Sequence, residues 1–98
     1  MHFRLVVLCR GYADRREVVK VEARLERRLV VGKRLFDYVD YMERYSPNRF
    51  PEEFEERGFV AATYTWDGKR LRRLGPGLRL PRGWRKRYRE VLVFDAHA

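Results

Sequence analysis

The stretch "GFVAATYTWDGKRLRRLG", residues 58–75, contains two runs of strand-forming residues joined by Asp67–Gly68. This dipeptide is typical of the two-residue type I′ turn of a β-hairpin, and such a turn pairs Trp66 with Lys69. Because side chains alternate along a strand, one face of the hairpin is predicted to be apolar core: Val60, Ala62, Tyr64, Trp66 and Leu71. The other face is predicted to be open and polar: Thr63, Thr65, Arg70 and Arg72.

Two further strands are predicted outside this hairpin. Residues 2–9, "HFRLVVLC", and 88–95, "YREVLVFD", are short and largely apolar, which is typical of strands buried on both faces. Between Glu17 and Val31 two patterns compete. Apolar residues alternate with charged ones as in a strand, which is the interpretation we prefer, but the same segment contains the helix-favouring run "EARLERRL".

The main helix is predicted over residues 33–45, "KRLFDYVDYMERY", where apolar residues recur at helical spacing before Ser46–Pro47. A further helical turn that begins at Pro51 is predicted over residues 51–58. Residues 75–87 predict a basic loop rich in Gly and Pro. The sequence therefore predicts a small single α+β domain over residues 1–98, with an antiparallel sheet of four to five strands and one main helix packed on one face.

The composition indicates a folded chain without disulfide, metal or cofactor. Hydrophobic residues make up 45% of the 98 residues, which is far from the composition of disordered proteins. Cys9 is the only cysteine, and His2 and His97 are the only histidines, so no disulfide can close within the chain and no zinc cluster of usual spacing is available. No apolar run approaches the roughly 20 residues of a membrane span, and we expect a cytoplasmic protein. Gln is absent and Asn occurs once, a scarcity typical of thermophilic proteins.

The charge is distributed unevenly along the chain. The net charge is +9, and residues 69–89 contain ten Lys or Arg and no Asp or Glu. Such repulsion is offset most directly by an anionic partner, and guanidinium groups interleaved with aromatic rings suit RNA. We therefore expect a non-catalytic RNA-binding protein, with ribosomal or other ribonucleoprotein RNA as the leading target and DNA as the alternative. The expected contacts are Arg70, Arg72, Arg79, Arg82, Trp84, Arg85, Lys86, Arg87 and Arg89.

A second hypothesis is a structural protein, for example a viral one, that binds itself or another protein. Residues 37–56 carry a net charge of −5 and could dock on the basic residues 69–89 of a neighbouring copy. That contact joins two different surfaces, so it would build homo-oligomeric rings or filaments.

The segment "CRGYADR", residues 9–15, follows a predicted strand and places five residues between Cys9 and Arg15. It resembles the phosphate loop of protein tyrosine phosphatases. The resemblance implies a thiolate nucleophile at Cys9 and a phosphate-binding arginine at Arg15, and hence a Cys-dependent phosphatase as a minor alternative. In that family a Ser or Thr follows the arginine, whereas here Arg15 is followed by Arg16. The competing interpretation is that Cys9 is a small core residue.

The segment "RGFVAATY", residues 57–64, resembles the octapeptide of RNA-recognition domains at Arg57, Gly58, Phe59 and Tyr64. The resemblance implies that Phe59 stacks on a base. The competing interpretation, which we prefer, is that Phe59 is a core residue at the start of a strand. The basic segment that follows resembles in style the Gly- and Pro-punctuated extensions of ribosomal proteins.

Overall fold

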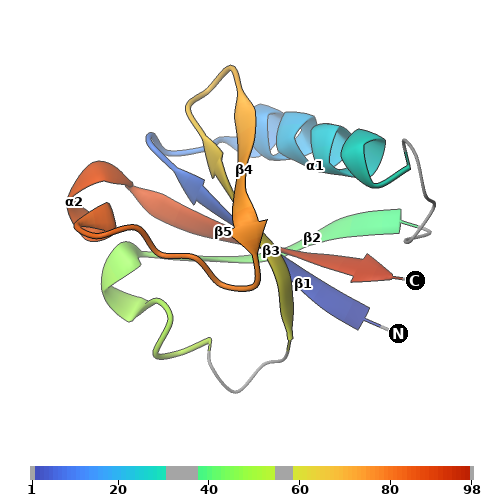
Figure 1. Ribbon diagram of the computed structural model, residues 1–98. Helices are drawn as coiled ribbons and strands as arrows, with labels where there is room; N and C mark the ends of the chain where they lie inside the picture. The colour runs from blue at the N-terminus through green and yellow to red at the C-terminus, as the bar shows by residue number, and fades with distance from the viewer. Residues whose placement is uncertain (1, 31–37, 55–58, 98) are drawn as a thin grey trace.

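The computed structural model describes residues 2–30, 38–54 and 59–97, which form one sheet with helical segments on both of its faces (Figure 1). In chain order the elements are β1 His2–Cys9, α1 Arg15–Val30, β2 Tyr38–Tyr45, a 3₁₀ helix Pro47–Arg49, β3 Val60–Trp66, β4 Leu71–Pro76, α2 Trp84–Arg87 and β5 Glu90–His97.

The sheet has five strands in the order β2-β5-β1-β3-β4. The predicted α+β architecture with one main helix is confirmed. The expectation of a purely antiparallel sheet is wrong, because β1 and β3 run parallel while the other three neighbouring pairs are antiparallel. A parallel pair needs a long crossover connection, and the chain between β1 and β3 supplies one through α1 and β2.

Each face of the sheet has its own hydrophobic core, because the central strands β1 and β5 are apolar on both sides, as predicted. α1 covers one face, whereas α2 and the segment after β2 lie on the other (Figure 1). The core under α1 includes Leu5, Val7, Val21, Leu25, Trp66, Leu71, Leu92 and Phe94. The second core includes Val6, Leu8, Phe50, Phe54, Trp84, Tyr88, Val91 and Val93.

The preference for a strand between Glu17 and Val31 is wrong over residues 17–30, which belong to α1, and residue 31 lies outside the described part of the chain. Val18, Val21 and Leu25 are buried at helical spacing, whereas Val19, which an alternating strand would bury together with Val21, is 57% exposed. The backbone N–H of Glu17 donates a hydrogen bond of 2.9 Å to the carboxylate of Asp14, which caps the helix. An acidic residue followed three positions later by Glu is the signal that identifies this helix start.

The helix predicted over residues 33–45 is also wrong where the structure describes it. Residues 38–45 form strand β2, which pairs with β5 along its whole length, and residues 31–37 lie outside the described part of the chain. A bulge between Tyr41 and Glu43 moves the buried side chains from one face to the other, so Val39 packs under α1 and Tyr45 in the second core. Pairing with a buried central strand outweighs the local helical spacing.

The helical turn predicted over residues 51–58 is not found where the structure describes this segment, because residues 51–54 form a turn outside any helix. The short helix here is Pro47–Arg49, and a hydrogen bond of 2.8 Å from the Phe54 N–H to the Pro51 carbonyl closes a turn after it. The rest of that prediction, residues 55–58, lies outside the described residues.

The hairpin β3–β4 is present, but its turn has four residues instead of two. Trp66 pairs with Leu71, and the Asp67 carboxylate accepts the backbone N–H groups of Lys69 and Arg70 at 2.8 and 2.7 Å. The observed partner of Trp66 lies two residues beyond the predicted one, Lys69. Because side chains alternate with a period of two, this shift leaves each side chain on its predicted face, and Trp66 and Leu71 are buried as predicted.

Two positions of the hairpin differ from the predicted faces. Val60 is buried in the second core instead of beside Ala62, because β1 and β3 change register at that point. Thr63, which was predicted to be open, is completely buried. Its hydroxyl donates to the Gly77 carbonyl at 2.7 Å and accepts the Arg79 N–H at 2.9 Å, which folds the following loop against the sheet.

Side chains of α1 reach both edge strands of the sheet. The carboxylate of Glu22 accepts the Tyr41 N–H of β2 at 2.7 Å. At the other edge, Arg24 and Arg28 donate to the backbone carbonyls of Lys69 and Leu71. Occupied edge groups are unavailable to a further strand, so these contacts oppose edge-to-edge association.

Candidate nucleic-acid interface

A basic groove lies at the end of the sheet where β1 and β3 finish and β4 and β5 begin. It has a volume of about 590 Å³ and is lined by Arg10, Thr65, Asp67, Arg70, Arg72, Arg73, Leu74 and Tyr88. Backbone hydrogen bonds continue past the strand ends here, from Arg10 to Trp66 at 3.0 Å and from Arg89 to Cys9 at 2.8 Å. These bonds fix the position of Arg10 beside the hairpin that carries the other three arginines.

The groove has a strong excess of positive charge. Its four guanidinium groups make no ion pair with any carboxylate of residues 2–30, 38–54 and 59–97. The only carboxylate in the lining is Asp67, and hydrogen bonds from the backbone of Arg70 and Lys69 hold its pKa below the ordinary value. That carboxylate is therefore ionised at neutral pH and bound to its own turn, which leaves four positive charges against one negative charge.

Only two of the nine residues predicted to contact nucleic acid, Arg70 and Arg72, line this groove. Two others are engaged elsewhere. Arg79 donates to the Pro76 carbonyl at 3.0 Å, and Arg85 joins α2 to the segment after β2 through the carbonyls of Pro47 and Phe50, at 2.9 and 2.6 Å.

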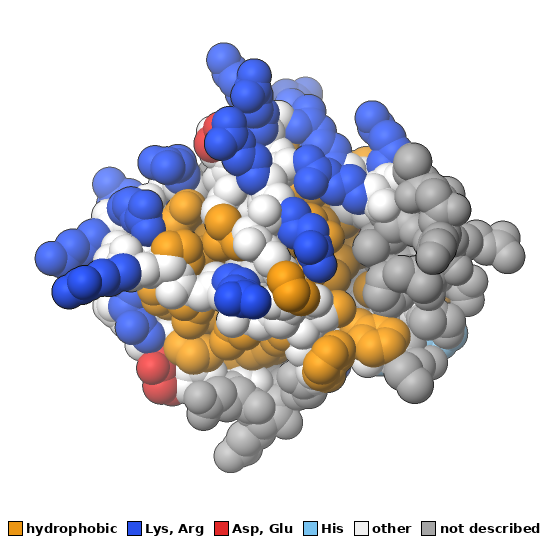
Figure 2. All heavy atoms as spheres, in the orientation of Figure 1, with side chains coloured by type: hydrophobic (Ala, Val, Ile, Leu, Met, Phe, Trp, Pro, Cys, Tyr) orange, Lys and Arg blue, Asp and Glu red, His pale blue; other side chains and the backbone are white. Residues whose placement is uncertain are grey.

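The remaining predicted arginines and lysine are exposed around α2. They are Arg82, Lys86, Arg87 and Arg89. Figure 2 shows basic side chains gathered over β4 and around α2 with apolar side chains between them. The groove adjoins both of these regions, since its lining includes Arg72 of β4 and Tyr88, which directly follows α2.

Trp84 does not have the role expected from the sequence. Its side chain is 5% exposed, and its ring meets Phe50 edge-on at a centroid distance of 6.2 Å in the second core. A buried indole offers no open face on which a base could stack, so the prediction that Trp84 stacks on RNA is wrong.

Six lining residues of the groove were not predicted as contacts, and three of them, Arg10, Arg73 and Tyr88, carry a guanidinium or an aromatic ring. Arg10 directly follows a buried strand, which places it at a sheet end, but its neighbours depend on the parallel pairing of β1 with β3. Tyr88 is 6% exposed, and the guanidinium carbons of Arg10 and Arg87 lie 5.6 and 5.7 Å from its ring centroid.

The resemblance to RNA-recognition domains does not extend to their binding surface. Those domains stack bases on an open sheet face, whereas here Tyr64 is 3% exposed in the core under α1. Phe59 is 66% exposed and contacts Phe3, so the interpretation of Phe59 as core is wrong. It precedes β3 and therefore lies at the opposite end of that strand from the groove.

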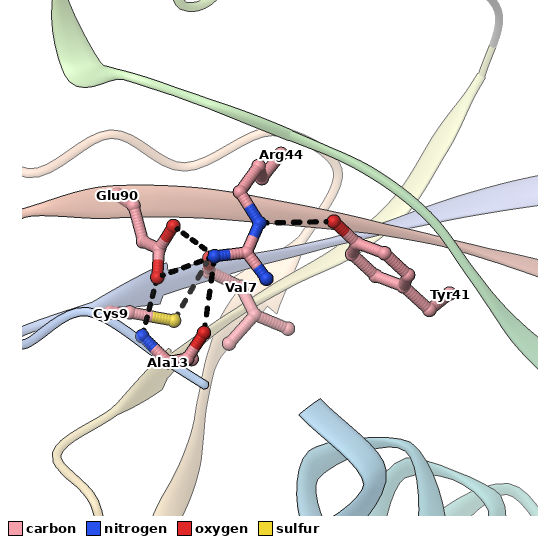
Figure 3. Close-up of polar contacts among 6 residues, drawn as sticks. All are labelled: Val7, Cys9, Ala13, Tyr41, Arg44 and Glu90. Carbon is pink, nitrogen blue, oxygen red and sulfur yellow. Dashed lines mark hydrogen bonds and ion pairs between the residues drawn. The ribbon is translucent and has the colours of Figure 1, made fainter. Parts of the chain in front are cut away.

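Cys9 is the last residue of β1 and precedes the loop that leads to α1, as in the phosphatase loop, but its surroundings differ (Figure 3). The thiol is fully buried, and the Ala13 N–H of the same loop donates to the carboxylate of Glu90 at 2.5 Å. Burial, followed by the negative charges of Glu90 and Glu17, raises the pKa of the thiol far above its ordinary value. A protonated, buried thiol beside a carboxylate does not provide the thiolate that this mechanism needs.

Glu90 instead joins three parts of the chain (Figure 3). Its buried carboxylate binds the Ala13 N–H and pairs with Arg44 of β2 at 3.1 Å, and Arg44 also donates to the Ala13 carbonyl at 3.1 Å. Replacing Glu90 with Ala should lower the free energy of unfolding by about 2–3 kcal/mol, because a buried N–H loses its acceptor and Arg44 loses its partner.

Urea unfolding measures this difference, with Glu52→Ala as the matched control. Glu52 also pairs with an arginine, Arg85 at 3.2 Å, but its side chain is 65% exposed, so its loss should cost less than about 1 kcal/mol. Equal stabilities of the two variants would show that the Glu90 contacts contribute nothing beyond a surface ion pair.

The described residues contain no group of three or more His, Cys, Asp or Glu side chains placed to hold a metal ion. Within the same residues, no helix has the length and apolar character required to cross a membrane. Comparisons with protein-family models, with curated proteins and with solved structures found no match to this chain.

Proposed function

We propose that this protein binds RNA without catalysing a reaction, and that phosphate groups of the RNA contact the basic groove. The observation that carries the proposal is the presence of Arg10, Arg70, Arg72 and Arg73 in one groove, where none of them makes an ion pair with a carboxylate of the described residues. Guanidinium groups bind phosphate oxygens in pairs of parallel hydrogen bonds, which makes arginine better suited than lysine to this task.

The exposed residues around α2 extend the proposed surface. A strand of RNA that leaves the groove past Tyr88 would meet Arg87, Arg82 and Lys86 next. Ribosomal or other ribonucleoprotein RNA is the class of target that we propose, with DNA as the alternative.

The rival hypothesis of assembly through residues 37–56 has less support. Within the described part of that segment, Glu52 already pairs with Arg85 of the same chain, and Arg49 lies 3.6 Å from Glu53. A neighbouring copy would have to compete with these contacts, and the edge strands are already bound by α1.

The salt dependence of binding tests the proposal. Each phosphate contact with a single strand contributes about −0.7 to the slope of log K against log salt, so three to four contacts in the groove predict a slope of about −2 to −3. Fluorescence anisotropy with a labelled RNA at several salt concentrations gives this slope. Affinity that is retained at high salt, with a slope near zero, would contradict phosphate binding and favour a protein partner.

A further inference from the structure

The groove combines its phosphate-binding groups with a fixed platform made of Arg10 and Tyr88. The Tyr88 ring is held in the second core and is 6% exposed, whereas Arg10 is exposed and has its guanidinium carbon 5.6 Å from the ring centroid. The position of Arg10 is further fixed by its backbone N–H, which donates to the Trp66 carbonyl at 3.0 Å. Because the tyrosine orders the guanidinium in advance, a ligand pays little entropy to use it.

A planar guanidinium can stack on a nucleic acid base, as aromatic side chains do, and an ammonium group cannot. The three arginines of the hairpin, Arg70, Arg72 and Arg73, line the same groove with Leu74. The site thus offers a stacking plane and several phosphate ligands, which are the two kinds of contact that an unpaired nucleotide makes.

The size of the groove supports a single nucleotide. Its volume of about 590 Å³ lies in the range of pockets that enclose one small molecule, roughly 300–1,000 Å³. In double-stranded RNA the bases are stacked inside the helix, and only phosphates, hydroxyls and base edges are accessible. A duplex could reach the outer arginines but could not place a base on Arg10.

We infer that the basic groove holds one unpaired nucleotide of a single-stranded RNA, with its base stacked on Arg10 and its phosphates against the arginines of the hairpin. This inference rests on the proposed function, and it adds that the partner is single-stranded and that a base contributes to binding.

The test compares Arg10→Lys with Arg70→Lys, since both changes keep the positive charge and both residues are exposed. The probes are oligo(A) of about 10 nucleotides, the same strand with abasic residues, and a blunt-ended RNA duplex without unpaired nucleotides, all at one salt concentration. Arg10→Lys should weaken oligo(A) binding about tenfold and leave binding of the abasic strand unchanged. Arg70→Lys should change either by less than about threefold, because a lysine still contacts a phosphate. Wild-type protein should bind oligo(A) more tightly than the duplex.

The outcomes separate the two levels of the account. If wild-type protein binds none of the three probes, the proposed function itself fails. If all probes bind but Arg10→Lys behaves as wild type with oligo(A), or the duplex binds as tightly as oligo(A), the inference of a stacked, unpaired nucleotide is overturned and phosphate binding remains. An equal loss for oligo(A) and the abasic strand would also overturn it, because Arg10 would then act as a phosphate ligand.

Discussion

Replacing Trp84 with Ala is expected to destabilise the protein by about 3–5 kcal/mol, the usual cost of removing a large aromatic side chain from a core. Trp84 is 5% exposed and packs with Phe50 in the second core, so its removal leaves a cavity beneath α2. Small domains have a total stability of roughly 5–15 kcal/mol, and a loss of this size should lower the melting temperature by more than about 10 °C. Circular dichroism at increasing temperature measures the change.

Tyr12→Ala is the matched control for this experiment. Tyr12 is also aromatic, but it is 73% exposed in the loop between β1 and α1, and its loss should change stability by no more than about 0.5 kcal/mol. If Trp84→Ala melts at the wild-type temperature and binds RNA more weakly, then Trp84 is a contact residue and the second core is described wrongly.

Reversing the charge of Arg70 and Arg72 together should weaken RNA binding by about 100-fold at physiological salt. Two phosphate contacts are lost, and two carboxylates replace them in the same groove. Both side chains are exposed and make no ion pair with the carboxylates of the described residues, so the melting temperature should change little. Binding isotherms of the folded variant with a single-stranded RNA give the measurement.

Arg16→Glu together with Arg27→Glu is the control, because it changes the net charge by the same amount on exposed positions of α1. The two changes have opposite interactions with the helix dipole, so their effects on stability should largely cancel. The control should weaken binding several-fold less than the groove variant. Equal losses would mean that the protein attracts RNA by its overall charge and that the groove is not the site.

Sequence patterns predicted the parts of the fold that depend on one strand at a time. The apolar runs 2–9 and 88–95 identified the two central strands, and the alternation around Trp66 and Leu71 identified the buried side of the hairpin although its turn was wrong. Sequence patterns could not show that residues 17–30 form a helix and residues 38–45 a strand, the reverse of the prediction. Both segments contain helical spacing, and the choice depends on pairing of β2 with β5, nearly fifty residues further along the chain.

The sequence predicted the positive charge of the candidate site but only two of its lining residues, Arg70 and Arg72. The run of arginines indicated a polyanion, but Arg85 and Arg79 are bound to backbone carbonyls, and a sequence does not show which carbonyls lie within reach. Arg10 is sixty residues from the hairpin and enters the groove only because β1 and β3 are parallel. Contacts of this kind are determined by topology, and local periodicity carries no signal for them.

The most direct test of the account is a titration of isotopically labelled protein with single-stranded RNA, followed by nuclear magnetic resonance of the backbone amides. The account predicts that the largest shifts occur at Arg10, Thr65, Tyr88 and residues 70–74, with smaller shifts around α2 and none on the outward face of α1. Shifts confined to α1 or to residues 38–54, the described part of the acidic segment, would contradict the claim that the basic groove binds RNA, and so would the absence of shifts at any RNA concentration.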